Sequence, residues 1–309
     1  MKKILSPKGI TCIAAIFVIV LGLTLGAFFD LDISKALAIN TTDESISLYN
    51  HPISSIILTV VGYFLPFVFI GFSAAVITLN MLRKKEKMKT IEKLVCIAMF
   101  IGVIACMAYL AYQTMETIST TKFGFWHYLM MALMIFVMTF LIWYVAINLN
   151  PAVVKKSHIS AIITVVTYGA AFVFTEAAKL IWGRIRPREL VELGSLDGFI
   201  NWYQVSGLTG HKSFPSGHSV EAVLMLLVII WMTALGASRK AKKVTTIGVL
   251  CWTSLIMFSR VLAGAHFVSD VTAGFAIGFA FLYIAFVMFE RKTGKSLYID
   301  APIRPDHII

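Results

Sequence analysis

Three short polar strings interrupt an otherwise apolar chain, and their residues are of types that bind and transfer phosphate. They are Lys179–Pro187 (KLIWGRIRP), Pro215–His218 (PSGH) and Ser259–Asp270 (SRVLAGAHFVSD). Each string combines a cation or an imidazole with small or hydroxyl-bearing residues. Fixed cations and helix-start amides neutralise an oxyanion, and imidazoles exchange protons near neutral pH. We therefore expect a phosphate-handling site if the fold brings the three strings together.

The first string offers two cations, Lys179 and Arg186, which stand seven residues apart. In a continuing helix they share one face about 10 Å apart along the axis, so both reach one phosphate group. A guanidinium presents a planar fork of donors, and an ammonium adds a compact charge. Pro187 then helps to end the helix. The alternative is that both cations only reach for the membrane interface, as Lys and Arg commonly do at helix ends.

The second string stands where a polar loop re-enters an apolar run. Ser216 is the expected N-cap, and Gly217 leaves the first amides of the helix open to an anion. His218 then projects from the first turn, where it can donate a proton to a leaving oxygen. The alternative is a plain serine-capped helix with an interfacial imidazole.

The third string ends an apolar run at Gly264 and Ala265, so we expect His266 in a turn between helices and Asp270 near the start of the next helix. A carboxylate four residues away can accept the Nδ1 hydrogen of an imidazole, which leaves Nε2 free to attack phosphorus. The alternative is that Asp270 only caps its helix. All three alternatives must hold together for the site to be absent, and we therefore prefer the chemical interpretation.

The spacing Lys-x6-Arg-Pro, Pro-Ser-Gly-His and Ser-Arg-x5-His-x3-Asp resembles the three-part signature of the type 2 phosphatidic acid phosphatase (PAP2) superfamily, in its membrane lipid phosphatase branch. No defining position departs from that signature. The resemblance covers residues 179–270, and the first half of the chain has no motif of its own. It implies an enzyme, a metal-independent hydrolase of phosphoric esters or diphosphates.

The resemblance also implies a role for each motif residue. His266 is the expected nucleophile that forms a phosphohistidine, Asp270 its orienting partner and His218 the general acid. The expected phosphate ligands are Lys179, Arg186, Ser216, Gly217 and Arg260. These cations and amides supply the charge that Mg²⁺ supplies in other phosphoryl-transfer enzymes, and no acidic cluster suited to a metal is apparent, so we expect no metal and no other cofactor.

Two further carboxylates stand close to the motifs. Glu176 precedes Lys179 by about one turn, and Glu221 follows Gly217 by about one turn. Ionisable residues in membrane helices are rare and commonly belong to functional sites. We expect each of these two carboxylates to pair with a cation of the site. We also expect an aromatic rim at the level of the lipid headgroups, formed by Trp182, Trp202, Tyr203 and Phe214.

The elements that must position these residues are membrane helices. Of the 309 residues, 59% are hydrophobic and only 14% are charged, and the mean hydropathy is +0.85. Crossing a membrane takes roughly 20 apolar residues, and eight runs are long enough. They lie near 11–29, 53–82, 94–112, 128–149, 159–182, 218–236, 245–264 and 270–289. We predict an all-α, polytopic membrane helix bundle.

The family core has six helices, so the resemblance leaves two extra helices at the N-terminus. We therefore expect N-terminal transmembrane helices of uncertain role over 1–93, a PAP2-like catalytic bundle over 94–290 and a cytoplasmic tail over 291–309. The first run follows Lys2, Lys3 and Lys8 and has no clear cleavage site, so it reads as a retained anchor. The four cysteines stand within apolar runs, which favours free thiols.

The net charge of +11 does not indicate a nucleic-acid partner, because the basic residues gather in alternate connectors and after the last run. That is the positive-inside pattern. It predicts a multi-pass plasma-membrane protein with both termini in the cytoplasm and with connectors 30–52, 113–127 and 183–217 outside. All three motifs then come to the outer face.

A site at that level favours a substrate whose phosphate lies at the interface and whose tail stays in lipid. In the family such substrates are phosphatidic acid, phosphatidylglycerol phosphate, undecaprenyl diphosphate and lipid A phosphates, and undecaprenyl diphosphate is our first guess by analogy alone. Two alternatives remain open: a lipid phosphotransferase that uses the same histidine, and a non-catalytic protein that binds or translocates lipid phosphates. A haloperoxidase is disfavoured by the eight apolar runs. Nothing in one sequence fixes the oligomeric state.

Overall fold

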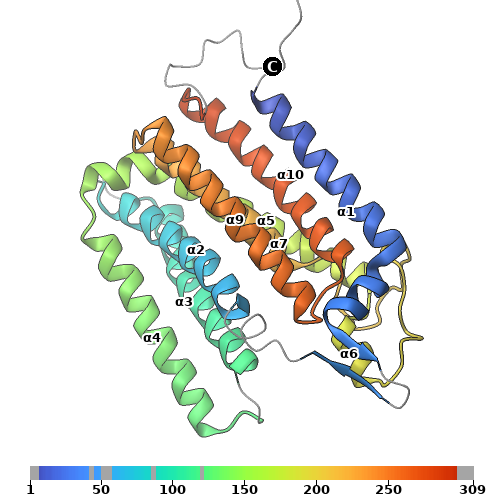
Figure 1. The fold of residues 1–309 in the computed structure, drawn as a ribbon. Helices are drawn as coiled ribbons and strands as arrows, with labels where there is room; N and C mark the ends of the chain where they lie inside the picture. Colours follow the sequence, from blue (N-terminus) through green and yellow to red (C-terminus); the bar gives the residue numbers. More distant parts are fainter. Residues whose placement is uncertain (1–6, 42–44, 50–57, 85–87, 119–121, 298–309) are drawn as a thin grey trace, which may run out of the picture. The chain divides into compact units, whose positions relative to one another are not determined.

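The computed structural model describes residues 7–41, 45–49, 58–84, 88–118 and 122–297, and these form long helices (Figure 1). Within these described residues, eight helical segments are long and apolar enough to cross a membrane. The prediction of an all-α polytopic bundle with eight spans is therefore confirmed, and the protein is a multi-pass membrane protein.

Seven of the spans contain one long helix each. These are α1 (Pro7–Leu37), α2 (Leu58–Leu82), α3 (Thr90–Ile118), α4 (Phe125–Ile147), α5 (Pro151–Trp182), α9 (Arg239–Leu262) and α10 (Val268–Thr293). The remaining span is divided into α7 (Gly217–Leu224), a 3₁₀ turn η2 (Met225–Leu227) and α8 (Val228–Ala234). The short helix α6 (Pro187–Glu192) follows α5.

The predicted connector 30–52 begins too early. α1 continues through Asp30 and Asp32 to Leu37, and Asp30 is only 1% exposed. The sequence analysis placed the end of the apolar run at residue 29, because a carboxylate such as that of Asp30 is costly inside a membrane helix. A carboxylate is tolerated there when it is paired, and Asp30 has its partners in this structure.

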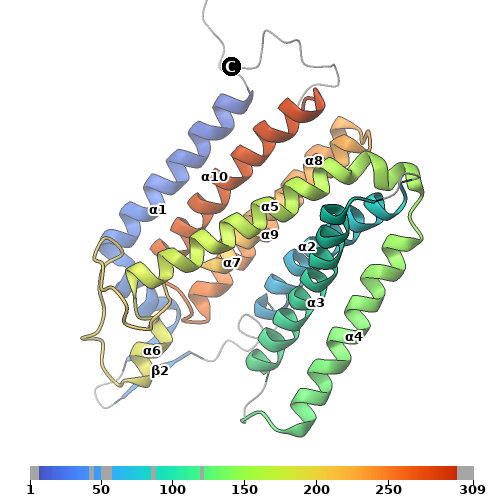
Figure 2. The ribbon, with the colours of Figure 1, turned by 180° about the vertical axis from the view of Figure 1, so that it is seen from behind.

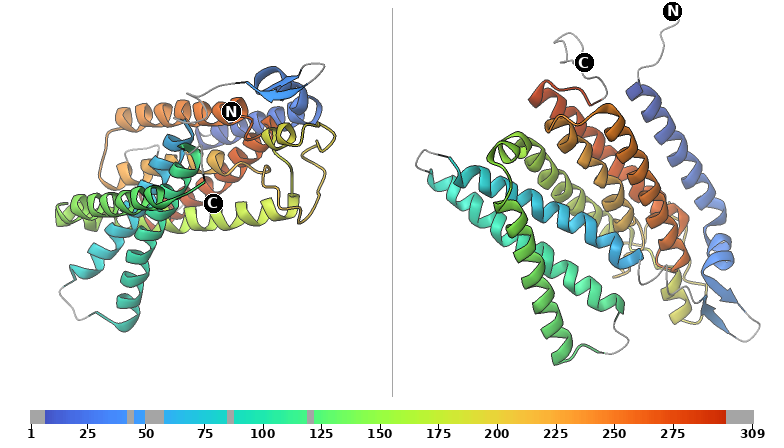
Figure 3. Two further views of the ribbon diagram at one scale, coloured as in Figure 1. Left: turned by 90° about the horizontal axis from the view of Figure 1, so that it is seen from below. Right: turned by 60° about the vertical axis from the view of Figure 1, so that its left-hand side comes forward.

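A small two-stranded hairpin follows α1, and the sequence analysis did not predict it. Strands β1 (Ile39–Thr41) and β2 (Ile46–Leu48) pair antiparallel, with Ile39 opposite Leu48 (Figure 3). The hairpin contacts α1 and α6. The side chain of Leu48 contacts Gly264, since a Cβ added to Gly264 would lie 2.9 Å from Leu48 Cδ2.

The chain forms two compact units, each assembled from separate stretches of sequence. The first holds the described residues within 1–59, 170–224 and 249–281, and the second those within 60–169, 225–248 and 282–309. All three motifs belong to the first unit. The boundary at residue 93 stays a prediction, but α1, which it leaves outside the catalytic bundle, lies in the same unit as the motifs.

In the first unit α1 runs beside α10 (Figures 1 and 2). Gly22 and Gly26 of α1 face it: a Cβ on Gly22 would lie 2.5 Å from Thr272 Oγ1, and one on Gly26 would lie 2.5 Å from Ser269 Cβ. Small residues four positions apart let two membrane helices approach closely. This close approach brings the end of α1 to the start of α10.

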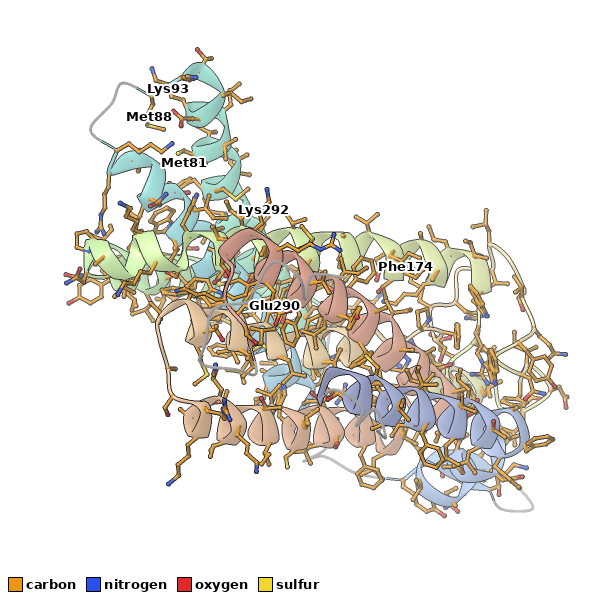
Figure 4. All side chains as sticks on the ribbon, turned by 90° about the horizontal axis from the view of Figure 1, so that it is seen from above. Met81, Met88, Lys93, Phe174, Glu290 and Lys292 are labelled. Carbon is orange, nitrogen blue, oxygen red and sulfur yellow. The ribbon has the colours of Figure 1, made fainter. Side chains whose placement is uncertain are left out.

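In the second unit α3 packs against α4, and Trp231 of α8 packs against two aromatic rings of α2. The ring of Trp231 lies 5.8 Å from those of Phe69 and Phe72, and its Nε1 donates to Thr164 Oγ1 at 3.0 Å. Figure 4 places Met81, Met88 and Lys93 together at the connector between α2 and α3, and Glu290 and Lys292 at the end of α10. Lys93 and Lys292 belong to the basic groups that the positive-inside pattern assigns to the cytoplasm.

Candidate active site

The sequence analysis expected the first motif to lie on one continuing helix. The structure divides it between two helices. α5 ends at Trp182, because Gly183 adopts the left-handed conformation with φ 54° and its amide donates to the Lys179 carbonyl at 3.0 Å. Arg186 instead precedes α6, which Pro187 opens. The expected shared face is therefore wrong, and Pro187 begins a helix where it was expected to help end one.

Lys179, the first residue of the first motif, reaches the second motif with its side chain. Its Nζ donates to Glu176 Oε1 at 2.6 Å. A Cβ placed on Gly217 would lie 3.3 Å from the same Nζ. A side chain at position 217 would therefore crowd the ammonium.

Arg186 is held at the start of α6 by a carboxylate of its first turn. Its amide donates to Glu189 Oε2 at 3.0 Å, and its Nε lies 3.9 Å from Glu189 Oε1. That Nε is buried and has no hydrogen-bond partner among the described residues. Buried donors are almost always satisfied, so an acceptor such as a phosphate oxygen fits this position.

The second motif brings a helix start to the same place. Ser216 directly precedes α7, and its amide donates to the Asp270 carbonyl at 3.0 Å. Its Oγ and that of Ser219 are buried without a hydrogen-bond partner in the part of the chain that the structure describes. The first amides of a helix have no intrahelical acceptor and lie at its positive end. These groups match the needs of a phosphate.

His218 lies on the first turn of α7, as predicted from the sequence, and is buried. It interacts electrostatically with His266 and with the three cations Lys179, Arg186 and Arg260. Glu221, one turn further along α7, interacts with Lys179. The structure therefore brings residues of all three motifs to one place.

The third motif forms a tight turn between α9 and α10. Gly264 is left-handed with φ 60°, and the amides of Ala265 and His266 donate to the Arg260 carbonyl at 3.0 and 3.2 Å. The Arg260 side chain is buried, with its Nε 3.2 Å from Ser259 Oγ. As predicted from the sequence, His266 lies in this turn and Asp270 in the first turn of α10.

The imidazole of His266 is fixed by a backbone carbonyl. His266 Nδ1 donates to the Ser213 carbonyl at 2.7 Å, and because a carbonyl only accepts, Nδ1 carries the hydrogen. Nε2 of the neutral ring is then unprotonated. The sequence analysis gave this hydrogen bond to Asp270, and that is wrong, since Asp270 Oδ2 lies 3.7 Å from Nδ1.

Both oxygens of Asp270 accept hydrogen bonds from other groups. Oδ1 accepts from Arg184 Nη1 at 2.6 Å, and Oδ2 accepts from Ser213 Oγ at 2.5 Å and from the Phe267 amide at 2.8 Å. The carboxylate is fully buried and stays close enough to His266 to stabilise a positive charge on its ring.

Burial lowers the pKa of His266 to about 4, because an imidazolium loses its hydration there. The Asp270 carboxylate opposes this effect, whereas Arg186 and Lys179 lower the pKa further. His266 is therefore neutral around pH 7, which is the form that a nucleophile needs.

Arg184 is a buried charged residue beside the site that the sequence analysis missed. It is fully buried and forms ion pairs with Asp270 at 2.6 Å and with Asp30 at 3.0 Å. Its signal was present, because a second arginine stands two positions before Arg186 in an apolar stretch. The sequence analysis assigned Asp30 to a connector. It had no means to identify Ser213, because the group that binds His266 is the backbone carbonyl, which every residue has.

Among the described residues, no group of three or more His, Cys, Asp or Glu side chains is arranged to hold a metal ion.

Comparison with known proteins connects this geometry to a family. Residues 160–294 match the family model described as the PAP2 superfamily. Phosphatidylglycerophosphatase B of Haemophilus influenzae is 32% identical over 86 residues, which cover 28% of this chain and 35% of that protein. Lipid A 1-phosphatase of Rhizobium johnstonii is 31% identical over 109 residues, which cover 35% of this chain and 39% of that protein.

A third relative, phosphatidylglycerophosphatase B of Bacillus subtilis, is 38% identical over 74 residues, which cover 23% of this chain and 36% of that protein. The chain thus spans between about a third and two fifths of the length of these curated relatives. No solved structure matches it.

Proposed function

We propose that the protein is a membrane lipid phosphatase of the PAP2 superfamily, whose family model matches residues 160–294. It removes a phosphate from a phosphomonoester or diphosphate of a lipid through a phosphohistidine on His266. The observation that carries the proposal is the His266 ring, buried beside the cations with its Nδ1 hydrogen on the Ser213 carbonyl.

The first half-reaction forms one bond and breaks one. Nε2 of His266 attacks phosphorus, and the bond between phosphorus and the lipid oxygen breaks. His218 gives its proton to that oxygen, which leaves as an alcohol or as a lipid phosphate. Asp270 stabilises the positive charge that develops on the His266 ring, because it lies 3.7 Å away and is fully buried.

The second half-reaction returns the enzyme to its starting state. Water attacks phosphorus and gives a proton to His218, the phosphorus–nitrogen bond breaks, and phosphate leaves. Two histidines with separate roles, a neutral nucleophile and a protonated general acid, explain the chemistry better than binding alone does, since capture of an anion needs only the cations.

Lys179, Arg186 and Arg260, together with Ser216, Gly217 and the first amides of α7, hold the phosphate oxygens in this proposal. Preorganised cations and amides stabilise the charge on the phosphoryl group in the transition state. This stabilisation is the main requirement of phosphoryl transfer. The buried donors Arg186 Nε and Ser216 Oγ, which lack partners among the described residues, support this assignment. Turnover is proposed to need no metal.

The substrate is proposed to be a lipid phosphate presented at the outer face of the plasma membrane, with both termini of the protein in the cytoplasm. The names of the relatives direct the test to phosphatidylglycerol phosphate and lipid A. Undecaprenyl diphosphate and phosphatidic acid complete the set, and undecaprenyl diphosphate remains the first guess by family analogy.

The test is phosphate release from these four lipids by the purified full-length protein in detergent with EDTA, for the wild type and for His266→Ala. We expect release by the wild type that is lost in the variant. A radiolabelled lipid should leave label on the protein in a linkage that survives alkali and is broken by acid, as a phosphoramidate is.

The same assay separates the alternatives. Transfer of label to an added lipid alcohol, with little free phosphate, supports a phosphotransferase. Binding of lipid without turnover by either protein overturns the enzymatic proposal. Release that EDTA abolishes contradicts metal independence.

A further inference from the structure

A buried cluster of charges lies behind the proposed active site, and Asp270 is the one member of it to which the sequence analysis gave a role. Arg184 is fully buried between two carboxylates: Nη1 donates to Asp270 Oδ1 at 2.6 Å, and Nη2 donates to Asp30 Oδ2 at 3.0 Å. Its Nε donates to the Ile200 carbonyl at 2.9 Å, and its guanidinium lies 4.2 Å from the centre of the Phe267 ring. Each of its three nitrogens therefore donates at least one hydrogen bond.

Asp30 also holds the first turn of α10. Its Oδ1 accepts from the Ser269 amide at 3.0 Å, and its Oδ2 accepts from the Ser269 hydroxyl. That hydroxyl in turn accepts from Arg184 Nη1 at 2.8 Å. A carboxylate at the start of a helix is stabilised by the unpaired amides and the positive end of the dipole. Here the carboxylate comes from a different helix, α1.

Several features of α1 serve to deliver this carboxylate. Gly22 and Gly26 leave room for Thr272 and Ser269 of α10, as described above. Trp202, in the loop between α6 and α7, donates from Nε1 to the carbonyl of Leu23 at 3.0 Å, between the two glycines along α1. α1 is therefore anchored on two sides in the two turns that precede Asp30.

Two carboxylates and one guanidinium in a fully buried place are costly, and they persist only when each charge is paired. Asp30, Arg184 and Asp270 satisfy one another, and the cluster retains one net negative charge. It lies next to His266, whose ring becomes positive when it is phosphorylated or protonated.

We propose that Asp30 of α1 is a positioning residue for the phosphoryl-transfer reaction. It acts through Arg184 and the first turn of α10 to hold Asp270, and through Asp270 and Ser213 it fixes His266. The inference rests on the proposed lipid phosphatase activity and adds to it a group from outside the segment that matches the family model, which begins at residue 160.

The test compares Asp30→Asn with Asp32→Asn in the full-length protein, on the lipid that the wild type hydrolyses. Asp32 lies two residues away on the same helix and is exposed, so it is a matched control. Removing Asp30 frees Arg184 and the start of α10 to shift, and a misplacement of about 1 Å can cost up to 10²-fold in rate. We expect kcat to fall at least about tenfold for Asp30→Asn, with the wild-type value for Asp32→Asn.

Two further measurements distinguish positioning from a general loss of structure. Lys179, Arg186 and Arg260 are untouched, so KM and the inhibition constant of inorganic phosphate should both stay within about threefold of the wild type, because uniform binding is retained. Ser269→Ala removes the hydroxyl shared by Arg184 and Asp30 but leaves both carboxylates in place. We expect it to lower kcat in the same direction by a smaller factor, and it decides the question if Asp30→Asn does not fold.

Unchanged kcat in folded Asp30→Asn overturns this inference, as does unchanged kcat in Ser269→Ala when Asp30→Asn does not fold. Equal losses in Asp30→Asn and Asp32→Asn also overturn it. A wild type that releases no phosphate from any of the four lipids overturns the proposed function and this inference with it. Release by the wild type with an unaffected Asp30→Asn variant overturns the inference alone.

Discussion

At the scale of single residues, the two histidines differ in their surroundings, and these surroundings suit them to different roles. His266 has its Nδ1 hydrogen committed to a backbone carbonyl, so its free nitrogen is Nε2. His218 stands on the first turn of α7 beside three cations. The first arrangement suits a nucleophile, and the second suits a group that gives up a proton as negative charge develops on the leaving oxygen.

The role of His218 as general acid predicts a dependence on the leaving group. His218→Ala should lower kcat by about 10²–10⁴-fold on a lipid phosphomonoester, whose alkoxide leaves poorly. On p-nitrophenyl phosphate, whose leaving group needs no proton, most of that loss should disappear. Steady-state kinetics on both substrates checks this, with His266→Ala as the comparison, which should be inactive on both. An equal loss on both substrates for His218→Ala would show that the residue only binds or packs.

Burial predicts that His266 titrates far below an ordinary histidine. Its pKa is lowered to about 4, so the ring should stay neutral and carry its hydrogen on Nδ1 from neutral pH down to about pH 5. The buried neutral ring also makes the folded state less stable as the pH falls below about 6.5, because the unfolded chain then binds the proton more readily. Nitrogen NMR of labelled histidines in detergent, assigned by His266→Ala, measures both the midpoint and the tautomer. A midpoint near the ordinary value contradicts the buried placement of the ring.

At the scale of elements, glycines end the helices that carry the motifs. Gly183 ends α5 and Gly264 terminates the turn after α9, so Arg186 and His266 lie on short irregular segments. Gly217 has a different purpose, because it lets the start of α7 approach the Lys179 ammonium. These positions therefore set the distances of the site more than the long helices do.

Gly217→Ala tests the approach of Lys179 to α7. The added Cβ would lie 3.3 Å from Lys179 Nζ, so the ammonium has to move by a few tenths of an ångström. We expect kcat/KM to fall by between about 3-fold and 10²-fold, with no loss of thermal stability, because alanine favours a helix over glycine. Gly248→Ala in α9 is the matched control, since a Cβ there meets nothing within 4 Å. Wild-type kinetics in Gly217→Ala would mean that the Lys179 ammonium does not hold the phosphate.

The packing of α1 on α10 predicts a stability effect. A Cβ on Gly26 would lie 2.5 Å from Ser269 Cβ and 3.0 Å from the Ser269 amide nitrogen, which is backbone and yields little. We expect Gly26→Ala to cost about 1–3 kcal/mol through overpacking. Thermal unfolding in detergent measures the loss, and Gly102→Ala in α3, where a Cβ meets nothing within 4 Å, should show none. Equal stability of the two variants argues against the close approach of α1.

At the scale of the whole molecule, eight spans and the distribution of basic residues predict which side of the membrane each connector faces. The positive-inside rule assigns the connector with Arg239, Lys240, Lys242 and Lys243 to the cytoplasm, and alternation then sends the connector 183–217 outside. Sidedness decides which leaflet supplies the substrate.

Cysteine labelling in intact cells tests that sidedness. In a background with the four native cysteines replaced by serine, Leu208→Cys should react with a membrane-impermeant maleimide and Lys240→Cys should not. Both positions are exposed, Leu208 by 85%, so access to reagent is limited only by the membrane. Labelling of both after permeabilisation is the control. The reverse pattern in intact cells places the site at the cytoplasmic face.

The sequence by itself determined the membrane class, the eight spans and the residues of the three motifs. Each of these depends on local information: a run of apolar residues long enough to cross a bilayer, or a fixed spacing of chemical groups. The placement of His266 in a turn and of Asp270 in the first turn of α10 followed from the same local signals.

Only the tertiary structure decided which groups these residues meet. A left-handed glycine ended α5 before Arg186, and the Ser213 carbonyl took the hydrogen bond that the sequence analysis gave to Asp270. Asp30, 240 residues before Asp270 in the chain, shares the guanidinium of Arg184 with it. The spacing of residues carries no information about partners so distant in sequence. A lone carboxylate in an apolar run is therefore interpreted as the end of a membrane helix until its buried partner is known.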